Sequence, residues 1–313
     1  MRKANVKKLL SSVLFGVLLA LLAWYLYANR ADLAKLLTLN FSTVSWMLIL
    51  ALAACVMNAV YHKLILDTYR LPLDVVDWMG VVFVSNAMAY VLPMRMDLVF
   101  TATYYKRTKN FAYTKSVSVA AGNIVFGVMF ALVQMLAALV CTGVIEGQWP
   151  GLLWLVLGIG CAGAAALAVI SIWFSDRMPA FLKKYRIVRE IIEGFAQLIR
   201  NKGLLWRLLA CLTVNNLLHL LLFMACFRGM GMQVTLYQAL FYNSVSRVLS
   251  LVAIVPANIG IAQGVMGVAG SLMGDVFQNG VMVSLFQSVA LMAVYIVAGG
   301  LFAYPVWRKW QGK

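Results

Sequence analysis

The chain has 313 residues, is 64% hydrophobic and carries a formal net charge of +16. No soluble core uses so much apolar sequence, and several runs reach the roughly 20 residues that a helix needs to span a bilayer. These runs are continuous rather than alternating, which excludes a transmembrane β-barrel. We therefore predict an all-α, polytopic membrane helix bundle. Its basic charge is expected to set the orientation and to contact anionic membrane lipids, not nucleic acid.

The first apolar run, 9–28, follows a basic N-terminal segment. It is longer than the apolar core of a signal peptide, about 7–15 residues, and it ends in aromatic residues that suit a membrane interface. We predict an uncleaved first span, with a cleaved signal peptide as the alternative. About six full spans are predicted in all, at 9–28, 44–62, 116–143, 151–174, 205–226 and 281–306.

Two further apolar stretches, 75–93 and 235–274, are interrupted by Pro93 and by Pro256 with Gly260. If 75–93 crossed the membrane, the basic block at 106–115 would lie outside, against the positive-inside rule. We therefore predict two broken or re-entrant helical segments that enter from opposite sides, as in the inverted repeats of secondary transporters. The alternative is that the prolines merely kink or end ordinary helices.

The spans form a single predicted membrane domain, 1–313, with halves at about 1–143 and 151–313. Between them, apolar residues recur every three or four positions among basic ones. This pattern predicts an amphipathic helix at 180–202 on the cytoplasmic leaflet, with a linker helix packed on the bundle as the alternative. Most of the basic residues then lie inside, which places both termini in the cytoplasm. The expected location is the cell membrane, in a bacterium the inner membrane.

Residues for acid–base chemistry are scarce, because the chain has only ten acidic residues and two histidines that lie far apart in sequence. There is no Ser/His/Asp set, paired-carboxylate site or Walker motif. The five cysteines lie in apolar runs without CxxC spacing. We therefore expect no enzymatic activity, no metal site and no cofactor.

What remains is a polar set at the two broken segments, which includes Arg95, Asp97 and Arg247. An arginine near bilayer depth costs roughly 2.5–3.5 kcal/mol on insertion scales, so it marks a site that faces a cavity or a partner. Its planar fork suits a phosphate. The alternative is an Arg95–Asp97 or Arg247–Asp97 pair that only locks the fold. The predicted substrate-binding residues are Asn86, Pro93, Arg95, Asp97, Asn243, Arg247, Pro256, Asn258, Gly260 and Gln263, with Asn123 as a further candidate.

At these residues the sequence resembles the flippase-like transmembrane region of the lysylphosphatidylglycerol synthases and their stand-alone bacterial and archaeal relatives. Nearly the whole chain is covered, although only two short motifs carry the resemblance. They are Asn86 with Leu92-Pro93-x-Arg95-x-Asp97, and Pro256-x-x-x-Gly260-x-x-x-Gly264. The family usually has Gly where this chain has Met96, and a Pro-Gly-Gly-x-Gly turn followed by Glu where this chain has Gln263. The second departure removes a carboxylate that ion or proton coupling would use.

The resemblance implies a lipid transporter or flippase that moves an anionic phospholipid or a polyprenyl-phosphate-linked lipid between leaflets. Two alternatives stay open: an integral membrane lipid-modifying enzyme or glycosyltransferase, and a non-transporting partner subunit of a lipid or cell-envelope synthase. The synthases also carry a soluble aminoacyl-transferase domain, which is not expected here because the sequence ends at Lys313. A homo-oligomer or a complex with a partner in cell-envelope synthesis is compatible with this interpretation.

Overall fold

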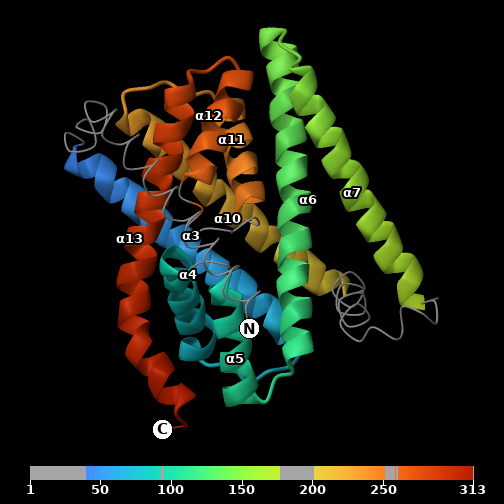
Figure 1. The fold of residues 1–313 in the computed structure, drawn as a ribbon, viewed down its shortest axis with the longest axis vertical. Coiled ribbons are helices and arrows are strands. Elements are labelled where there is room, and N and C mark those ends of the chain that lie inside the picture. The colour runs from blue at the N-terminus through green and yellow to red at the C-terminus, as the bar shows by residue number, and fades with distance from the viewer. Residues whose placement is uncertain (1–39, 93–94, 177–200, 251–257, 259, 313) are drawn as a thin grey trace, which may run out of the picture.

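The computed structural model describes residues 40–92, 95–176, 201–250, 258 and 260–312, and nearly all of them are helical (Figure 1). The predicted span at 9–28 and almost all of the predicted amphipathic helix at 180–202 lie outside these residues. Pro93 and Pro256 lie outside them as well. The described elements are α3 (Phe41–Asp67), η1 (Val76–Gly80), α4 (Val81–Val91), α5 (Met96–Lys109), α6 (Tyr113–Glu146), α7 (Gly151–Asp176), α10 (Lys202–Gly229), α11 (Leu236–Leu249), α12 (Ile261–Leu272) and α13 (Phe277–Trp310).

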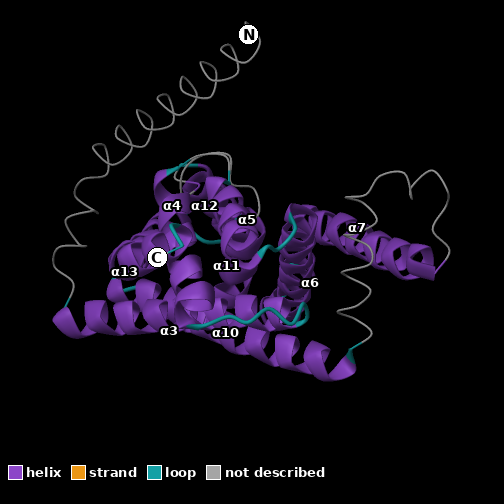
Figure 2. Cartoon of the chain, turned by 90° about the horizontal axis from the view of Figure 1, so that it is seen from below, coloured by secondary structure: helices purple, strands orange, loops and turns teal. Residues whose placement is uncertain are grey.

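Four of the described helices, α3, α6, α10 and α13, are long and apolar enough to cross a membrane. They contain the spans predicted at 44–62, 116–143, 205–226 and 281–306 and extend several residues beyond each. The fifth predicted span, 151–174, is α7, which lies outside the bundle against α6 (Figure 2). The prediction of a multi-pass helical membrane protein is therefore confirmed.

The predicted stretch 235–274 contains both helices of a hairpin, α11 and α12, whereas 75–93 contains only η1 and α4, and α5 completes that hairpin beyond the predicted end. Each hairpin occupies only part of the height of the bundle. In Figure 1 the hairpin α4–α5 fills the lower half and the hairpin α11–α12 the upper half. Their tips meet in the middle, where Nη1 of Arg95 donates a hydrogen bond of 2.8 Å to the carbonyl of Ser250. The interruptions are therefore breaks between paired half-helices. Of the alternative that the prolines merely kink or end ordinary helices, a kink within one continuous helix is wrong.

The two halves repeat the same order of elements: a long helix, a hairpin and a second long helix. α3 packs along α10, so the first helices of the two halves lie side by side (Figure 2). The first helix of each hairpin packs on the last long helix of the other half, α4 on α13 and α11 on α6. An inverted repeat predicts this reciprocal exchange, and it holds both hairpin tips at one central point.

Candidate functional site

A cavity of about 290 Å³, here called the central cavity, lies where the two hairpin tips meet. Six of the ten predicted site residues line it: Asn86, Arg95, Asp97, Asn243, Arg247 and Asn258. Asn123 of α6 lines it too. Pro93 and Pro256 are not described, so their predicted role is untested. The sequence thus identified a set of residues that the fold brings together from distant parts of the chain.

A broken helix inside a bundle leaves backbone carbonyl and amide groups unpaired. Polar side chains at the hairpin tips form hydrogen bonds with some of these groups. Nδ2 of Asn258 donates to the carbonyl of Leu249 (2.7 Å), where α11 ends. At the start of α12, Oε1 of Gln263 accepts from the backbone amide of Gly260 (2.7 Å), whose φ of +88° favours glycine. Gly260 and Gln263 therefore shape the tip but do not line the cavity.

Arg95 occupies the turn that starts α5, with a left-handed φ of +56° that is uncommon for a residue with a side chain. Its Nε lies 3.7 Å from Oδ1 of Asp97, so the expected Arg95–Asp97 pair is present at ion-pair distance but beyond hydrogen-bond distance. Within the described part of the chain, this carboxylate oxygen is buried and accepts no hydrogen bond. Among the described residues, the guanidinium of Arg95 therefore donates to the carbonyl of Ser250 but forms no hydrogen bond with Asp97.

Arg247 lies in the last turn of α11 and contributes the second guanidinium to the central cavity. Among the described residues no carboxylate lies within 4.0 Å of it, so the alternative Arg247–Asp97 pair is not formed. Its partner is an amide: oriented so that both its polar atoms are satisfied, Asn215 accepts from Nη2 of Arg247 (3.1 Å) and donates to the carbonyl of Ala54 (3.1 Å). A cation held inside an apolar bundle by a neutral amide leaves its charge available to an anion.

Much of the rest of the cavity wall comes from the long helices, whose polar side chains are not among the predicted site residues. The amide of Gln287 on α13 accepts from Ser246 (3.3 Å) and lies 3.5 Å from Nδ1 of His219 on α10. The amide of Asn58 on α3 donates to the hydroxyl of Tyr295 (3.3 Å). The lining residues with polar side chains that were not predicted are Asn58, Tyr90, Asn215, His219, Ser246, Ser250, Gln287 and Tyr295.

A signal for some of these residues exists in the sequence. Asn58-x-x-x-His62 in α3 recurs as Asn215-x-x-x-His219 in α10, 157 positions later, and the same offset relates Asn86 to Asn243. An Asn and a His four positions apart lie on one face of a helix. Aligning the two halves on this repeat would have placed both histidines near the site, although they are far apart in sequence.

A second cavity of about 370 Å³, the lower cavity, adjoins the central one toward the end of the bundle where α5 joins α6. The two share Asn58, Asn86, Arg95, Asp97, Asn123 and Ile124 in their walls. His62 lines only the lower cavity, whose wall is more apolar than that of the central cavity. The two adjoining cavities are together called the chamber, which is polar at the centre and more apolar toward that end.

Comparison with known proteins agrees with this arrangement. A family model described as the lysylphosphatidylglycerol synthase transmembrane region matches residues 9–299, nearly the whole chain. No curated protein matches the sequence, and no solved structure does. The match includes both hairpins, the long helices α3, α6 and α10, and α13 as far as residue 299. The chain therefore belongs to the family of the lysylphosphatidylglycerol synthase transmembrane region.

Proposed function

We propose that this membrane protein moves an anionic, phosphate-bearing lipid between the two leaflets, with the headgroup passing through the central cavity. One observation carries the proposal: Arg95 and Arg247, from hairpins that enter at opposite ends, line a single polar cavity inside an apolar bundle. Two planar guanidinium groups are suited to a phosphate, which can accept a fork of hydrogen bonds from each.

The helix termini at the hairpin tips add to this positive potential. α5 begins at Met96 and α12 at Ile261, so the N-termini of both second half-helices lie at the tips. Unpaired amide groups and the helix dipole make such termini favourable places for an anion. Asp97 is the one carboxylate among the described residues of the cavity wall, and it lies beside Arg95. The site is therefore cationic overall and suits an anionic headgroup.

The polar wall also addresses the main barrier to lipid exchange, which is the loss of hydration when a charged headgroup enters hydrocarbon. The amides of Asn58, Asn123, Asn215 and Gln287 can replace part of that hydration, while the acyl chains stay in the bilayer. A lipid-modifying enzyme that works with paired carboxylates would need a second one beside Asp97, and the described wall offers none. Transport is therefore the function that this geometry supports best.

The test is a scrambling assay in proteoliposomes with fluorescent phosphatidylglycerol or phosphatidylcholine. The purified protein is expected to accelerate exchange of the anionic lipid more than that of the zwitterionic one. Arg95→Gln and Arg247→Gln should each lose this acceleration, whereas Arg228→Gln, an exposed arginine at the end of α10, should keep it. Exchange no faster than in protein-free vesicles, for either lipid, would refute the proposal.

A further inference from the structure

The two halves differ at one seam, the contact between the second hairpin helix and the following long helix. In the second half this seam is tight: a side-chain carbon added at Gly280 of α13 would lie 2.3 Å from the carbonyl oxygen of Met266 in α12. One added at Gly267 would lie 2.6 Å from the ring of Phe277. The equivalent helices of the first half, α5 and α6, pack far less closely along their length. The contact between α5 and α6 is thus open, whereas glycines allow α12 and α13 to pack closely.

The lower cavity occupies this loose seam. Its wall takes Leu98, Thr101 and Ala102 from α5, and Val117, Ala120, Ala121 and Ile124 from α6. Val117 lines the cavity and is 41% exposed, so its side chain is not covered by packing at the seam. The seam between the two helices is therefore not filled by side chains at this position. Because α6 is apolar and long enough to cross a membrane, a lipid chain is a suitable occupant of this seam.

The polarity of the chamber changes along its length in the same order as that of an anionic lipid, from a charged headgroup to an apolar chain. Arg95 and Asp97 lie in the wall shared by the two cavities, so a phosphate at the arginines can continue directly into an acyl chain in the seam. Lys106 and Lys115 flank the same end of α5 and α6. Basic residues at a membrane surface attract anionic lipid by about 1 kcal/mol each. A path from Lys106 and Lys115 through the lower cavity to the central cavity therefore passes basic residues, then a more apolar wall and then a cationic site.

We propose that the α5–α6 seam is the lateral entrance for the lipid and that the lower cavity holds its acyl chain during transfer. The occupant is one chain of a phosphate-bearing anionic lipid, drawn from the leaflet at the Lys106–Lys115 end. In this conformation the chamber is open to that leaflet through the first half, while the glycine contacts of α12 and α13 close the equivalent seam. This inference rests on the proposed function, since it supplies the route by which the lipid reaches the arginines.

Photolabelling of the full-length wild-type protein tests the entrance directly. The probe is phosphatidylglycerol with a diazirine on one acyl chain, in phosphatidylcholine vesicles, and labelled residues are mapped by mass spectrometry. We expect adducts within 98–102 and 117–121 that excess unlabelled phosphatidylglycerol removes and excess phosphatidylcholine does not. Labelling on the outer face of α6, at Val133, should not respond to either competitor. The proposal would be overturned if excess phosphatidylglycerol did not reduce labelling at the α5–α6 seam. It would also be overturned if excess phosphatidylglycerol reduced labelling equally at the α12–α13 seam.

A matched pair of substitutions on α6 separates this proposal from the proposed function. Ala121→Trp fills the seam and should slow phosphatidylglycerol exchange several-fold per folded molecule, while Val133→Trp on the exposed face should not. Arg95→Gln is included as a headgroup-site variant. If Arg95→Gln slows exchange and Ala121→Trp does not, the entrance is wrong and the headgroup site stands. If Arg95→Gln exchanges lipid at the wild-type rate, Arg95 is not part of the headgroup site; if the wild-type protein exchanges no lipid, the proposed function itself fails.

Discussion

Among the described residues, the two cavity arginines donate their hydrogen bonds to neutral groups, and this determines how substitutions should act. Arg95 donates to the carbonyl of Ser250 and Arg247 to the amide of Asn215, so neither guanidinium is used up by a short carboxylate contact among the described residues. A hydrogen bond to a charged group contributes about 1.5–3 kcal/mol. A second hydrogen bond from the same planar group is lost when arginine becomes lysine, although the charge is kept.

Arg95→Lys and Arg247→Lys are therefore each expected to slow exchange of anionic lipid about tenfold or more per folded molecule. The double variant should lose less than the sum of the two single losses, because the two side chains share one ligand. The measurement is the exchange rate of phosphatidylglycerol, normalised to monodisperse protein, with Arg228→Lys as the control. Full activity in the double variant would remove both residues from the headgroup site.

How far the sequence predicts the site depends on where each residue lies. Arg95, Asp97 and Arg247 are conspicuous because a charge in an apolar run is costly, and that cost singles them out without any structure. Asn58 and Gln287 give no such signal, since a single amide inside a long span also occurs where helices only pack. Their role becomes visible when the fold brings four long helices and two hairpins to one point. For Asn58 it is also visible when the two halves are aligned.

At the scale of elements, one buried carboxylate joins three of them at the end of the bundle where α5 joins α6. Asp77 in η1 is fully buried and lies 2.6 Å from Nζ of Lys109 at the end of α5. It lies 3.3 Å from Nζ of Lys309 at the end of α13, and it accepts from the hydroxyl of Tyr104 (2.9 Å). Removing one partner of a buried ion pair leaves the others without compensation, which is more damaging than losing an exposed pair.

Asp77→Asn is expected to lower the free energy of unfolding by about 2–3 kcal/mol, somewhat less than for a fully buried pair because both lysines are partly exposed. The matched control is Asp67→Asn, which breaks the exposed Lys63–Asp67 pair and should cost no more than about 0.5 kcal/mol. Thermal unfolding in detergent, followed by the loss of monodisperse protein, compares the two. Equal stability of both variants would show that the Asp77 cluster does not hold these elements together.

The glycine contacts between α12 and α13 give a second prediction at this scale. Gly280→Ala places a carbon against the backbone of Met266 and should destabilise the protein by about 1–3 kcal/mol through overpacking. Gly300→Ala in the same helix meets no atom within 4 Å and should be neutral or stabilise by up to about 1 kcal/mol, since alanine favours a helix. Thermal unfolding of the two variants decides the matter. An unchanged midpoint for Gly280→Ala would mean that α12 can move away from α13 at little cost.

The prolines and the charge pattern predict both hairpins, but the lengths of the half-helices come from the fold. α5 extends to Lys109, so three residues of the basic block, Lys106, Arg107 and Lys109, lie in its last turn. Basic side chains there are favourable because they face the negative end of the helix dipole. The sequence pattern marks the block as basic without showing that the helix continues through it.

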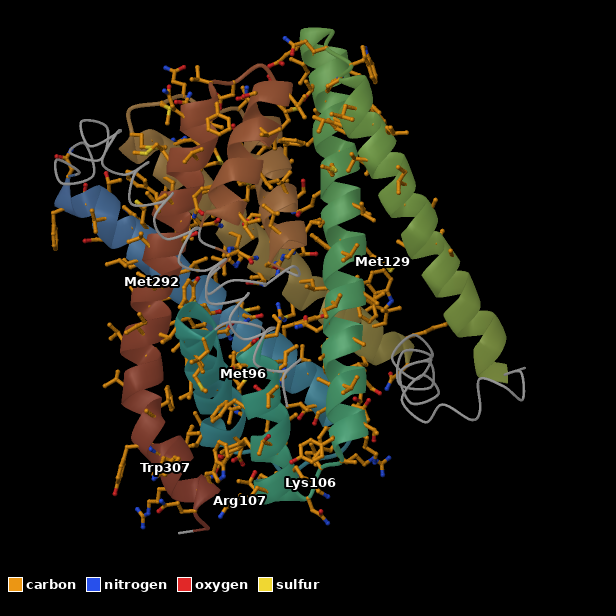
Figure 3. The ribbon with its side chains drawn as sticks, in the orientation of Figure 1. Met96, Lys106, Arg107, Met129, Met292 and Trp307 are labelled. Carbon is orange, nitrogen blue, oxygen red and sulfur yellow. The ribbon has the colours of Figure 1, made fainter. Side chains whose placement is uncertain are left out.

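For the whole molecule, the distribution of charge predicts which end of the bundle faces the cytoplasm. Lys106, Arg107 and Trp307 lie at the same end of the bundle (Figure 3), next to the C-terminal turn with Arg308 and Lys309. The opposite end, where α6 joins α7 and α12 joins α13, carries Glu146 and Asp275. Positive loops are retained in the cytoplasm, and a tryptophan beside them suits the membrane interface. The end with Lys106 is therefore the predicted cytoplasmic end, from which the hairpin α4–α5 enters.

This orientation predicts that a membrane-impermeant maleimide labels Gln148→Cys in intact cells and labels Arg107→Cys only after permeabilisation. Both side chains are exposed; Gln148 lies in the loop after α6 and Arg107 in the last turn of α5, at opposite ends of the bundle, so they report on the two faces of the membrane. Gln311→Cys should behave like Arg107→Cys, because the C-terminal turn lies at the same end. The wild-type protein, with its native cysteines, gives the baseline. Labelling of Arg107→Cys from outside would show that the bundle has the opposite orientation. The proposed lipid entrance between α5 and α6 would then open to the outer leaflet.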